Sequence, residues 1–238
     1  MGNGKSRAVH WKVLVLCVLS AFGNAACGAL VSGVLGLSLY LDTVFTVAVT
    51  FSFGLLPGLL TGALLYPGYN ILRNIILNTG ADTFWAVNAF ILCTVSEILL
   101  VSIFRSGIVP APGRDTGGLP KRPRRFVPLG ESFLFSFIGI AAQLMVLAAL
   151  DCVVVSITGG LVDFVLHTLP ASPGGTYPED IFKLSLFRNN VPYLASAILS
   201  RIPINIVDRF IAVFAGYGIS LLYRAWAAPR FPVIPGGR

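Results

Sequence analysis

One stretch near the C-terminus combines an apolar background with charged side chains. It begins the last long apolar segment of the chain, yet it carries Arg201, Asp208 and Arg209 together with Asn205. Charged groups inside a membrane are costly unless they are paired or face a cavity, so they indicate a functional site. After Pro203, which suits the first turn of a helix, the polar residues recur at spacings of three and four on one helix face. The pattern predicts either a binding surface or the place where a span meets water.

A second polar stripe lies on the third apolar segment. Asn70, Asn74 and Asn78 are spaced by four residues, and Arg73 lies between them. This is helical spacing on an otherwise apolar segment. Three asparagines in register favour a polar cavity lined by one helix, and a solvated helix end is the alternative.

Two carboxyl groups complete the set of polar groups in apolar surroundings. Asp42 follows a short loop after the first apolar segment, and Glu97 lies inside the fourth. A carboxyl group within a membrane needs a partner or a proton. Glu97 could therefore either stabilise helix packing or contact a ligand.

Catalytic and metal-binding chemistry finds little support in the sequence. The motifs GxSxG and HExxH do not occur, and there is no GxxxxGK[ST] for ATP binding. The histidines and cysteines are scattered and form no CxxC pair, so we expect a non-catalytic protein without metal or cofactor. They are His10, His167, Cys17, Cys27, Cys93 and Cys152.

The composition places these side chains in a membrane protein. Apolar residues make up 55% of the 238 residues and charged residues only 11%, whereas soluble domains carry about 25% charged residues. Several windows exceed the roughly 18 apolar residues that a membrane span requires. We therefore expect an all-α integral membrane protein, a single domain over residues 1–238 with about six transmembrane helices. The spans are expected at residues 12–34, 43–56, 59–77, 84–104, 133–156 and 203–226.

The connections account for the net charge of +7, which is no sign of nucleic-acid binding. Residues 105–130 are basic and rich in proline and glycine, and they predict an irregular cytoplasmic loop under the positive-inside rule. With an even number of spans, the basic N-terminus and the basic tail, residues 227–238, are then cytoplasmic as well. We expect a multi-pass protein of the cell membrane, with both termini in the cytoplasm.

The region before the last span is expected to lie outside the cell, at residues 157–200. Its two apolar pieces, residues 161–169 and 191–199, are too short to span and predict interfacial or re-entrant helices. Under this topology one external face is shared by Asp42, the stripe from Asn70 to Asn78, Asp151 and the stretch from Arg201 to Asp208. One outward-facing polar pocket over an apolar body is the simplest arrangement that contains them.

Small residues mark a packing face on the first segment. Ala21, Ala25 and Ala29 recur every four residues, a spacing that lets another helix approach closely. The partner helix could belong to this protein or to a second membrane protein.

The order and spacing of several short motifs resemble those of the substrate-binding S components of energy-coupling factor (ECF) transporters. LYLDT at 39–43 and FGLLPGLLTG at 53–62 resemble the signature of the family's second and third helices. RIPINIVDR at 201–209 resembles the last-helix motif, in which a lysine more commonly follows the aspartate. The alanine stripe is similar to the first-helix motif that docks on the transmembrane coupling subunit.

The resemblance implies an S-component-like bundle that captures a vitamin-like micronutrient from outside the cell. Such a protein delivers its ligand to a coupling subunit and ATPase subunits, where ATP is hydrolysed. Matched positions imply ligand contacts from Asp42, Asn205 and Asp208, and the expected topology adds Asn70, Arg73, Asn74 and Arg201. The long basic loop and the region before the last helix depart from the family pattern, which leaves the substrate open.

The alternative is a membrane sensory or regulatory module of a signalling system, without catalytic activity, because similar six-helix regions can precede signalling domains. No such domain follows Trp226 in this sequence, which favours transport.

Overall fold

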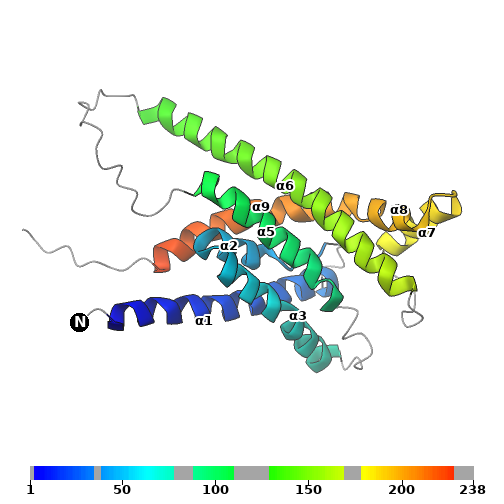
Figure 1. The fold of residues 1–238 in the computed structure, drawn as a ribbon, viewed down its shortest axis with the longest axis horizontal. Coiled ribbons are helices and arrows are strands. Elements are labelled where there is room, and N and C mark those ends of the chain that lie inside the picture. The colour runs from blue at the N-terminus through cyan, green and yellow to red at the C-terminus, as the bar shows by residue number, and fades with distance from the viewer. Residues whose placement is uncertain (1–2, 35–38, 78–87, 110–128, 169–177, 228–238) are drawn as a thin grey trace, which may run out of the picture.

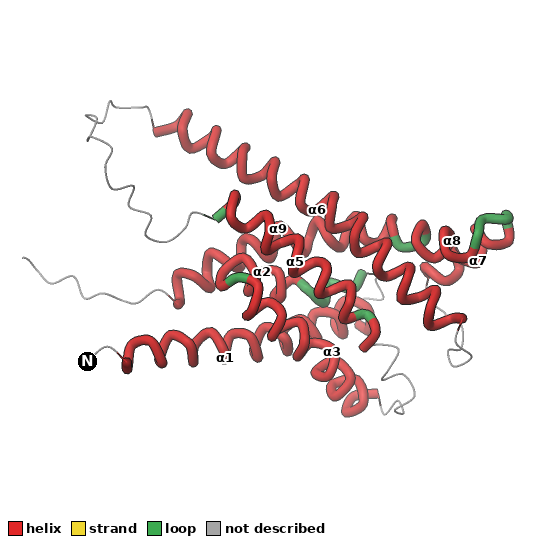
Figure 2. The backbone as a smooth tube through the Cα atoms, in the orientation of Figure 1, coloured by secondary structure: helices red, strands yellow, loops and turns green. Residues whose placement is uncertain are grey.

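The computed structural model describes residues 3–34, 39–77, 88–109, 129–168 and 178–227, and the elements it describes there are all helical (Figures 1 and 2). This confirms the predicted all-α class. The elements are α1 (Asn3–Gly28) with the π-helical segment η1 (Ala29–Val34), α2 (Val44–Phe53), α3 (Leu55–Leu77), α5 (Ile91–Ile108), α6 (Leu129–Thr168), α7 (Pro178–Arg188), α8 (Tyr193–Leu199) and α9 (Ile202–Ala227).

Four stretches among the described residues are helical, long and apolar enough to cross a membrane, which supports the expected membrane class. They are Trp11–Val31, Ile91–Ile108, Phe137–Leu166 and Tyr193–Ala227. The other two predicted spans correspond to α2 and α3, in which the apolar helices Val44–Phe53 and Leu55–Gly68 are shorter. A helix as short as α2 extends about 15 Å, half the roughly 30 Å hydrocarbon thickness of a bilayer.

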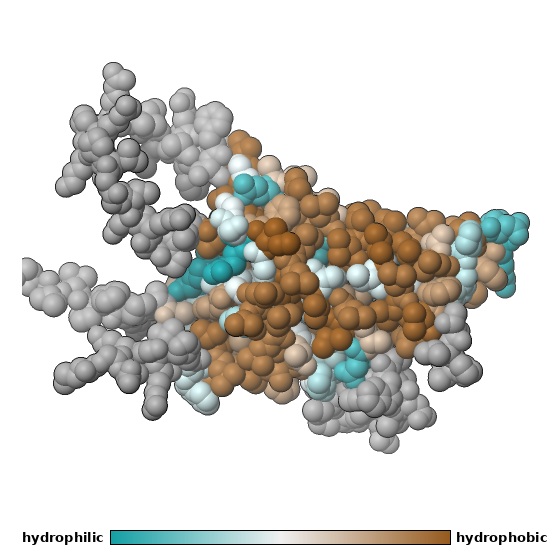
Figure 3. All heavy atoms as spheres, in the orientation of Figure 1, coloured by the Kyte–Doolittle hydropathy of each residue, from teal (hydrophilic) through white to brown (hydrophobic). Residues whose placement is uncertain are grey.

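The outer surface of the bundle has the character of a lipid-facing surface. Apolar side chains cover the middle of the molecule in Figure 3, and hydrophilic ones gather toward its ends. Large apolar side chains on α1, α5 and α9 are exposed, among them Leu19, Ile103 and Leu222. So much exposed apolar area is unusual for a protein in water and normal for one in lipid.

Helix α2 lies at the centre of the bundle and packs against α1, α3, α5 and α9. Its residues are apolar or small on all sides and nearly all are buried, as expected for a helix surrounded by others. Neighbouring helices satisfy its free backbone groups. The Asn24 side chain on α1 accepts from the Phe45 N–H at 2.8 Å, and Arg105 on α5 donates to the Phe51 carbonyl at 2.9 Å. A helix end without such partners would be unstable away from water.

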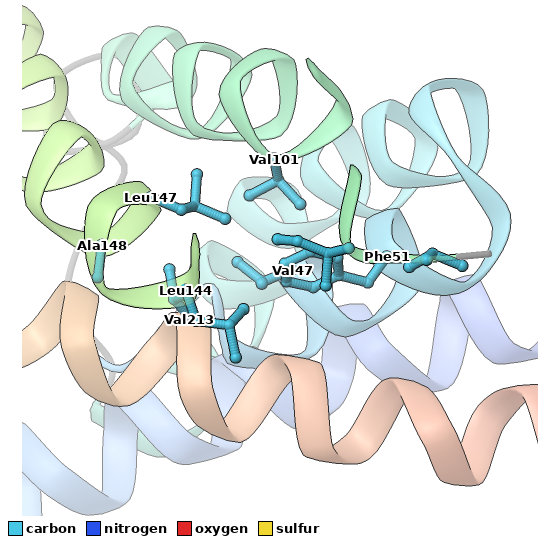
Figure 4. Close-up of a cluster of buried hydrophobic side chains, with 9 residues drawn as sticks. Val47, Phe51, Val101, Leu144, Leu147, Ala148 and Val213 are labelled. Atoms are coloured by element: carbon cyan, nitrogen blue, oxygen red, sulfur yellow. The ribbon is translucent and has the colours of Figure 1, made fainter. Parts of the chain in front are cut away.

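The apolar core forms where α2, α5, α6 and α9 meet. Val47, Phe51, Val101, Leu147 and Val213 are all fully buried there, and Figure 4 shows them pointing toward one another from these four helices. The core therefore fixes the helices that also carry the charged groups described below.

Glycines allow α2 to be approached closely from two sides. A Cβ atom at Gly216 of α9 would lie 2.7 Å from Val47, and one at Gly58 of α3 would lie 2.3 Å from the Thr50 hydroxyl. Small residues at such contacts are typical of helices packed within membranes. Pro57 and Gly58 belong to the first turns of α3, where a missing N–H costs nothing, and the chain turns between α2 and α3 at Gly54 (φ 95°).

Helix α6 is longer than the sequence predicted. The fifth span was expected to end near residue 156, and residues 161–169 were expected to form a separate external piece, but α6 continues to Thr168 as a single helix of 40 residues. Gly160 lies within this continuous helix and allows close packing, because a Cβ atom there would lie 2.5 Å from Ile198 of α8. The external segment predicted at 157–200 therefore shrinks to the part that follows α6.

The start of α1 and the end of α9 lie side by side at one end of the bundle (Figure 1). The Lys12 ammonium lies 5.1 Å from the centre of the Trp226 ring, and the hydroxyls of Ser20 and Tyr223 are 2.9 Å apart. The end of α5 and the start of α6 face the same way, while α7 and α8 lie at the opposite end. The described helix ends nearest the two termini and nearest residues 110–128 therefore lie at the same end of the bundle.

Candidate ligand-binding site

A buried arginine organises the polar interior of the bundle. Arg209, on α9, forms an ion pair with Glu97 of α5 at 2.9 Å and a second with its neighbour Asp208. It also donates to the Thr43 hydroxyl at 2.9 Å, and that hydroxyl donates to Glu97 at 3.1 Å. Arg209, Glu97 and Asp208 are each at most 4% exposed. Residues from three distant parts of the chain thus share one guanidinium group.

The loop before α2 closes this group on one side. Asp42 lies 3.9 Å from the Arg209 guanidinium, and its side chain is 26% exposed. The neighbouring Leu41 donates its N–H to Asp208 at 2.8 Å and adopts a φ of 41°. This left-handed conformation is rare for a bulky residue and costs about 1–3 kcal/mol. Such strain persists where surrounding contacts impose it, and it is concentrated at binding and active sites.

Asp151 lies on the other side of the group, near the middle of the candidate span Phe137–Leu166. It is 0% exposed and interacts electrostatically with Glu97 and Arg209. Neither of its oxygens has a hydrogen-bond partner among the residues described. The sequence placed Asp151 toward the external face, but α6 continues so far beyond it that it lies deep in the bundle.

These five residues, Asp42, Glu97, Asp151, Asp208 and Arg209, are called the core cluster below. All four carboxyl groups interact electrostatically with the one guanidinium. When every group is ionised, three negative charges are left without a counterpart among the described residues. Burying charge without compensation costs several kcal/mol per ion, so the core cluster needs bound protons or a bound cation.

A second charged cluster, the end cluster, lies where α6, α7 and α8 meet. It consists of Asp163, Asp180, Lys183 and Arg201. Lys183 lies 2.9 Å from both Asp163 and Asp180, and Arg201 lies 3.9 Å from Asp163. Burial lowers the pKa of Lys183, but its hydrogen bonds to the two aspartates outweigh burial and raise the pKa above its ordinary value. Two cations here face two anions, so the charges balance.

The structure separates the predicted ligand-binding residues. Asp42 and Asp208 meet at Arg209. Asn205 is buried one turn before Arg209, and its amide donates to the Ser156 hydroxyl of α6 at 2.9 Å. Arg201 belongs to the end cluster and lies 5.0 Å from the centre of the Phe90 ring.

The side chains of the predicted polar stripe on α3 lie outside the part of the chain that the structure describes. Asn70, Arg73 and Asn74 are carried by this helix, but their side chains lie outside the described residues, and Asn78 lies beyond the helix as described.

The alanine stripe packs largely inside the protein. Ala21 and Ala25 are at most 4% exposed, while Ala29 is half-buried in η1. Helix α1 packs against α2 and α3. Of the two alternatives for this stripe, internal packing accounts for the burial of Ala21 and Ala25.

The expected set of ligand contacts omitted the central residues of the core cluster. Arg209 and Glu97 both showed a signal, since each is a charge within an apolar segment. No spacing rule connects them, because they are 112 residues apart. Asp151 carried the same signal, a charge within the apolar segment 133–156, and was expected on the external face, whereas Thr43 had no comparable signal. Their roles depend on how α2 and α6 pack against α5 and α9.

The described residues contain no group of three or more His, Cys, Asp or Glu side chains arranged to hold a metal ion. The contacts of the core cluster offer hydrogen bonding and charge compensation around Arg209. Comparison of the chain with protein-family models, with curated proteins and with solved structures found no match.

Proposed function

We propose that this protein captures a small polar solute from outside the cell and delivers it, as the substrate-binding subunit of an ECF-type importer, to a membrane coupling subunit and its ATPases. The core cluster carries the proposal. Asp42 and Asp208, which the resemblance to S components marks as ligand contacts, lie on the same buried guanidinium. Ionisable groups inside a membrane bundle mark substrate pathways more often than they stabilise a fold.

Two further features support a binding role. Within the core cluster, Asp42 is partly exposed and Asp151 is fully buried, so a ligand that first meets Asp42 would pass from a solvent-accessible group toward a buried one. The strained backbone at Leu41 lies next to Asp42 and is held by Asp208.

The test begins with the full chain, purified from membranes into lipid nanodiscs. Small molecules extracted from it are identified by mass spectrometry, and B vitamins are tested one at a time in equilibrium binding. We expect one vitamin-like compound to be enriched over empty nanodiscs. Asp42→Asn should weaken its binding by about 10- to 100-fold, the usual effect of losing one charge-assisted hydrogen bond.

Asp180→Asn is the matched control, because it makes the same change in the end cluster and should leave the affinity unchanged. In parallel, co-expression with an ECF coupling subunit and ATPases should yield a complex on affinity purification. An equal loss of affinity in both variants would contradict the assigned site. The absence of both an enriched compound and a complex would refute the proposed function.

A further inference from the structure

The unequal numbers of acids and bases in the core cluster carry an inference about the ligand. Arg209 uses one terminal nitrogen for Glu97 and Thr43, and the other for Asp208 and Asp42. None of these contacts reaches Asp151, whose two oxygens have no hydrogen-bond partner among the described residues. Glu97 Oε2 and Arg209 Nε are also buried without a hydrogen-bond partner there.

Asp151 is the unusual member of the group, because it is fully buried and still lacks a donor. A buried acceptor that is left unpaired costs about 1–3 kcal/mol, and more when it is charged. Such groups in a native protein call for an explanation, which includes an unseen ligand. Asp151 interacts with the Glu97 carboxyl group, so a donor placed between them would reach two acids at once.

The chemistry of that missing donor can be narrowed. A planar amidinium or a primary ammonium group carries several N–H donors and a positive charge, and it can serve two carboxylates together. Asp42, which is partly exposed, would attract the same charge as the solute enters.

We propose that Asp151 and Glu97 bind the positively charged group of the captured solute, an ammonium or amidinium group, so that the solute is an organic cation or a zwitterion. This rests on the proposed function, because it concerns the ligand of the same site. Arg209 then keeps Asp208 and Glu97 in place, while the ligand supplies the positive charge that the bundle lacks.

The test compares two probes of nearly the same shape, methylguanidinium and the neutral methylurea, at the same millimolar concentration and ionic strength. The full chain in nanodiscs is held at neutral pH, and the midpoint of thermal unfolding is measured. A ligand that binds only the folded state raises this midpoint. We expect methylguanidinium to raise it by a few degrees in the wild type and methylurea to leave it unchanged.

Three variants locate the effect. Asp151→Asn and Glu97→Gln should each abolish the response to methylguanidinium, and Asp180→Asn in the end cluster should keep it. The use of two core variants guards against one that fails to fold. A response that persists in both core variants would overturn the assignment, as would an equal response to methylurea.

Protons are the competing means of compensation, and they give a different result. If protons alone neutralise the acids of the core cluster, the wild type responds to neither probe. Its thermal unfolding midpoint then rises on mild acidification, and this rise is absent in Asp151→Asn. That outcome overturns the inference. If a solute still co-purifies and Asp42→Asn weakens its binding, the proposed function is retained. If no solute co-purifies either, both proposals are refuted.

Discussion

The core cluster and the end cluster are built from the same kinds of residue but differ in charge balance. In the end cluster, Lys183 and Arg201 face Asp163 and Asp180. In the core cluster, one guanidinium faces four carboxyl groups. Both clusters are largely buried, and both include residues of α6. Burial and hydrogen bonding alone therefore do not distinguish a structural ion network from a binding site.

The difference lies in what each cluster still needs. A balanced network satisfies its charges internally, and it ties α7 to α6 through Lys183. An unbalanced one is incomplete until a proton or a ligand arrives, and perturbed, incompletely paired groups are characteristic of functional sites. Removal of an acidic charge should consequently have opposite effects on stability in the two clusters, whereas removal of a cation should destabilise both to different extents.

Removal of the central cation should have the largest effect. Arg209→Met leaves Glu97 and Asp208 buried without a counter-charge, and loss of one partner from a buried pair costs about 3–5 kcal/mol of unfolding free energy. Lys183→Met should cost less, about 1–3 kcal/mol, because Arg201 remains near Asp163. Denaturant unfolding of the purified variants in detergent measures both. Equal losses would show that the two clusters do not differ in the way described.

The two aspartates of α6 provide a matched pair of substitutions whose expected effects on the unfolding free energy have opposite signs. Asp163→Asn weakens the partner of Lys183 and should lower the unfolding free energy by about 2–3 kcal/mol. Asp151→Asn removes a buried charge that has no donor and should raise the unfolding free energy by up to about 1 kcal/mol in the absence of ligand. The same unfolding experiment compares them. A marked destabilisation by Asp151→Asn would mean that its carboxyl group already has a partner in the folded protein.

Helix packing should affect the core cluster through α2. Gly216→Ala places a methyl group 2.7 Å from Val47, and overpacking of this kind should cost about 1–2 kcal/mol. It should also separate α9 from α2, and thus Arg209 from Thr43. Gly218→Ala is the control, because nothing lies within 4 Å of its added atom. The thermal unfolding midpoints of the two variants are compared with that of the wild type. Similar shifts for both variants would contradict close packing at Gly216.

The smallest effect concerns pH. The raised pKa of Lys183 means that its stabilising contribution is complete below the ordinary lysine value of 10.5 and is lost as pH rises through the higher value of the folded protein. The stability difference between wild type and Lys183→Met should thus be constant below pH 10.5 and narrow above it. The difference between wild type and Arg209→Met should not narrow there, since arginine stays charged. Unfolding at a series of alkaline pH values tests both statements.

Much of the fold was accessible from the sequence because it depends on local pattern. The expected first, third and last spans overlap α1, α3 and α9 closely, since long apolar runs and the proline at residue 203 act within one helix. Where residues meet in space, the sequence was less informative. The fifth span was expected to end near residue 156, whereas α6 continues to Thr168. The residues beyond 156 pack against distant parts of the chain, Gly160 against Ile198 and Asp163 against Lys183 and Arg201.

The sequence by itself determined that charged and amide side chains enter apolar helices, and it singled out Asp42, Asn205 and Asp208. It also showed that Glu97 needs a partner. Only the tertiary structure decided that this partner is Arg209 and that Arg201 belongs to a different cluster. The physical reason is that the cost of burying a charge is a property of one residue, while its compensation depends on which helices pack together.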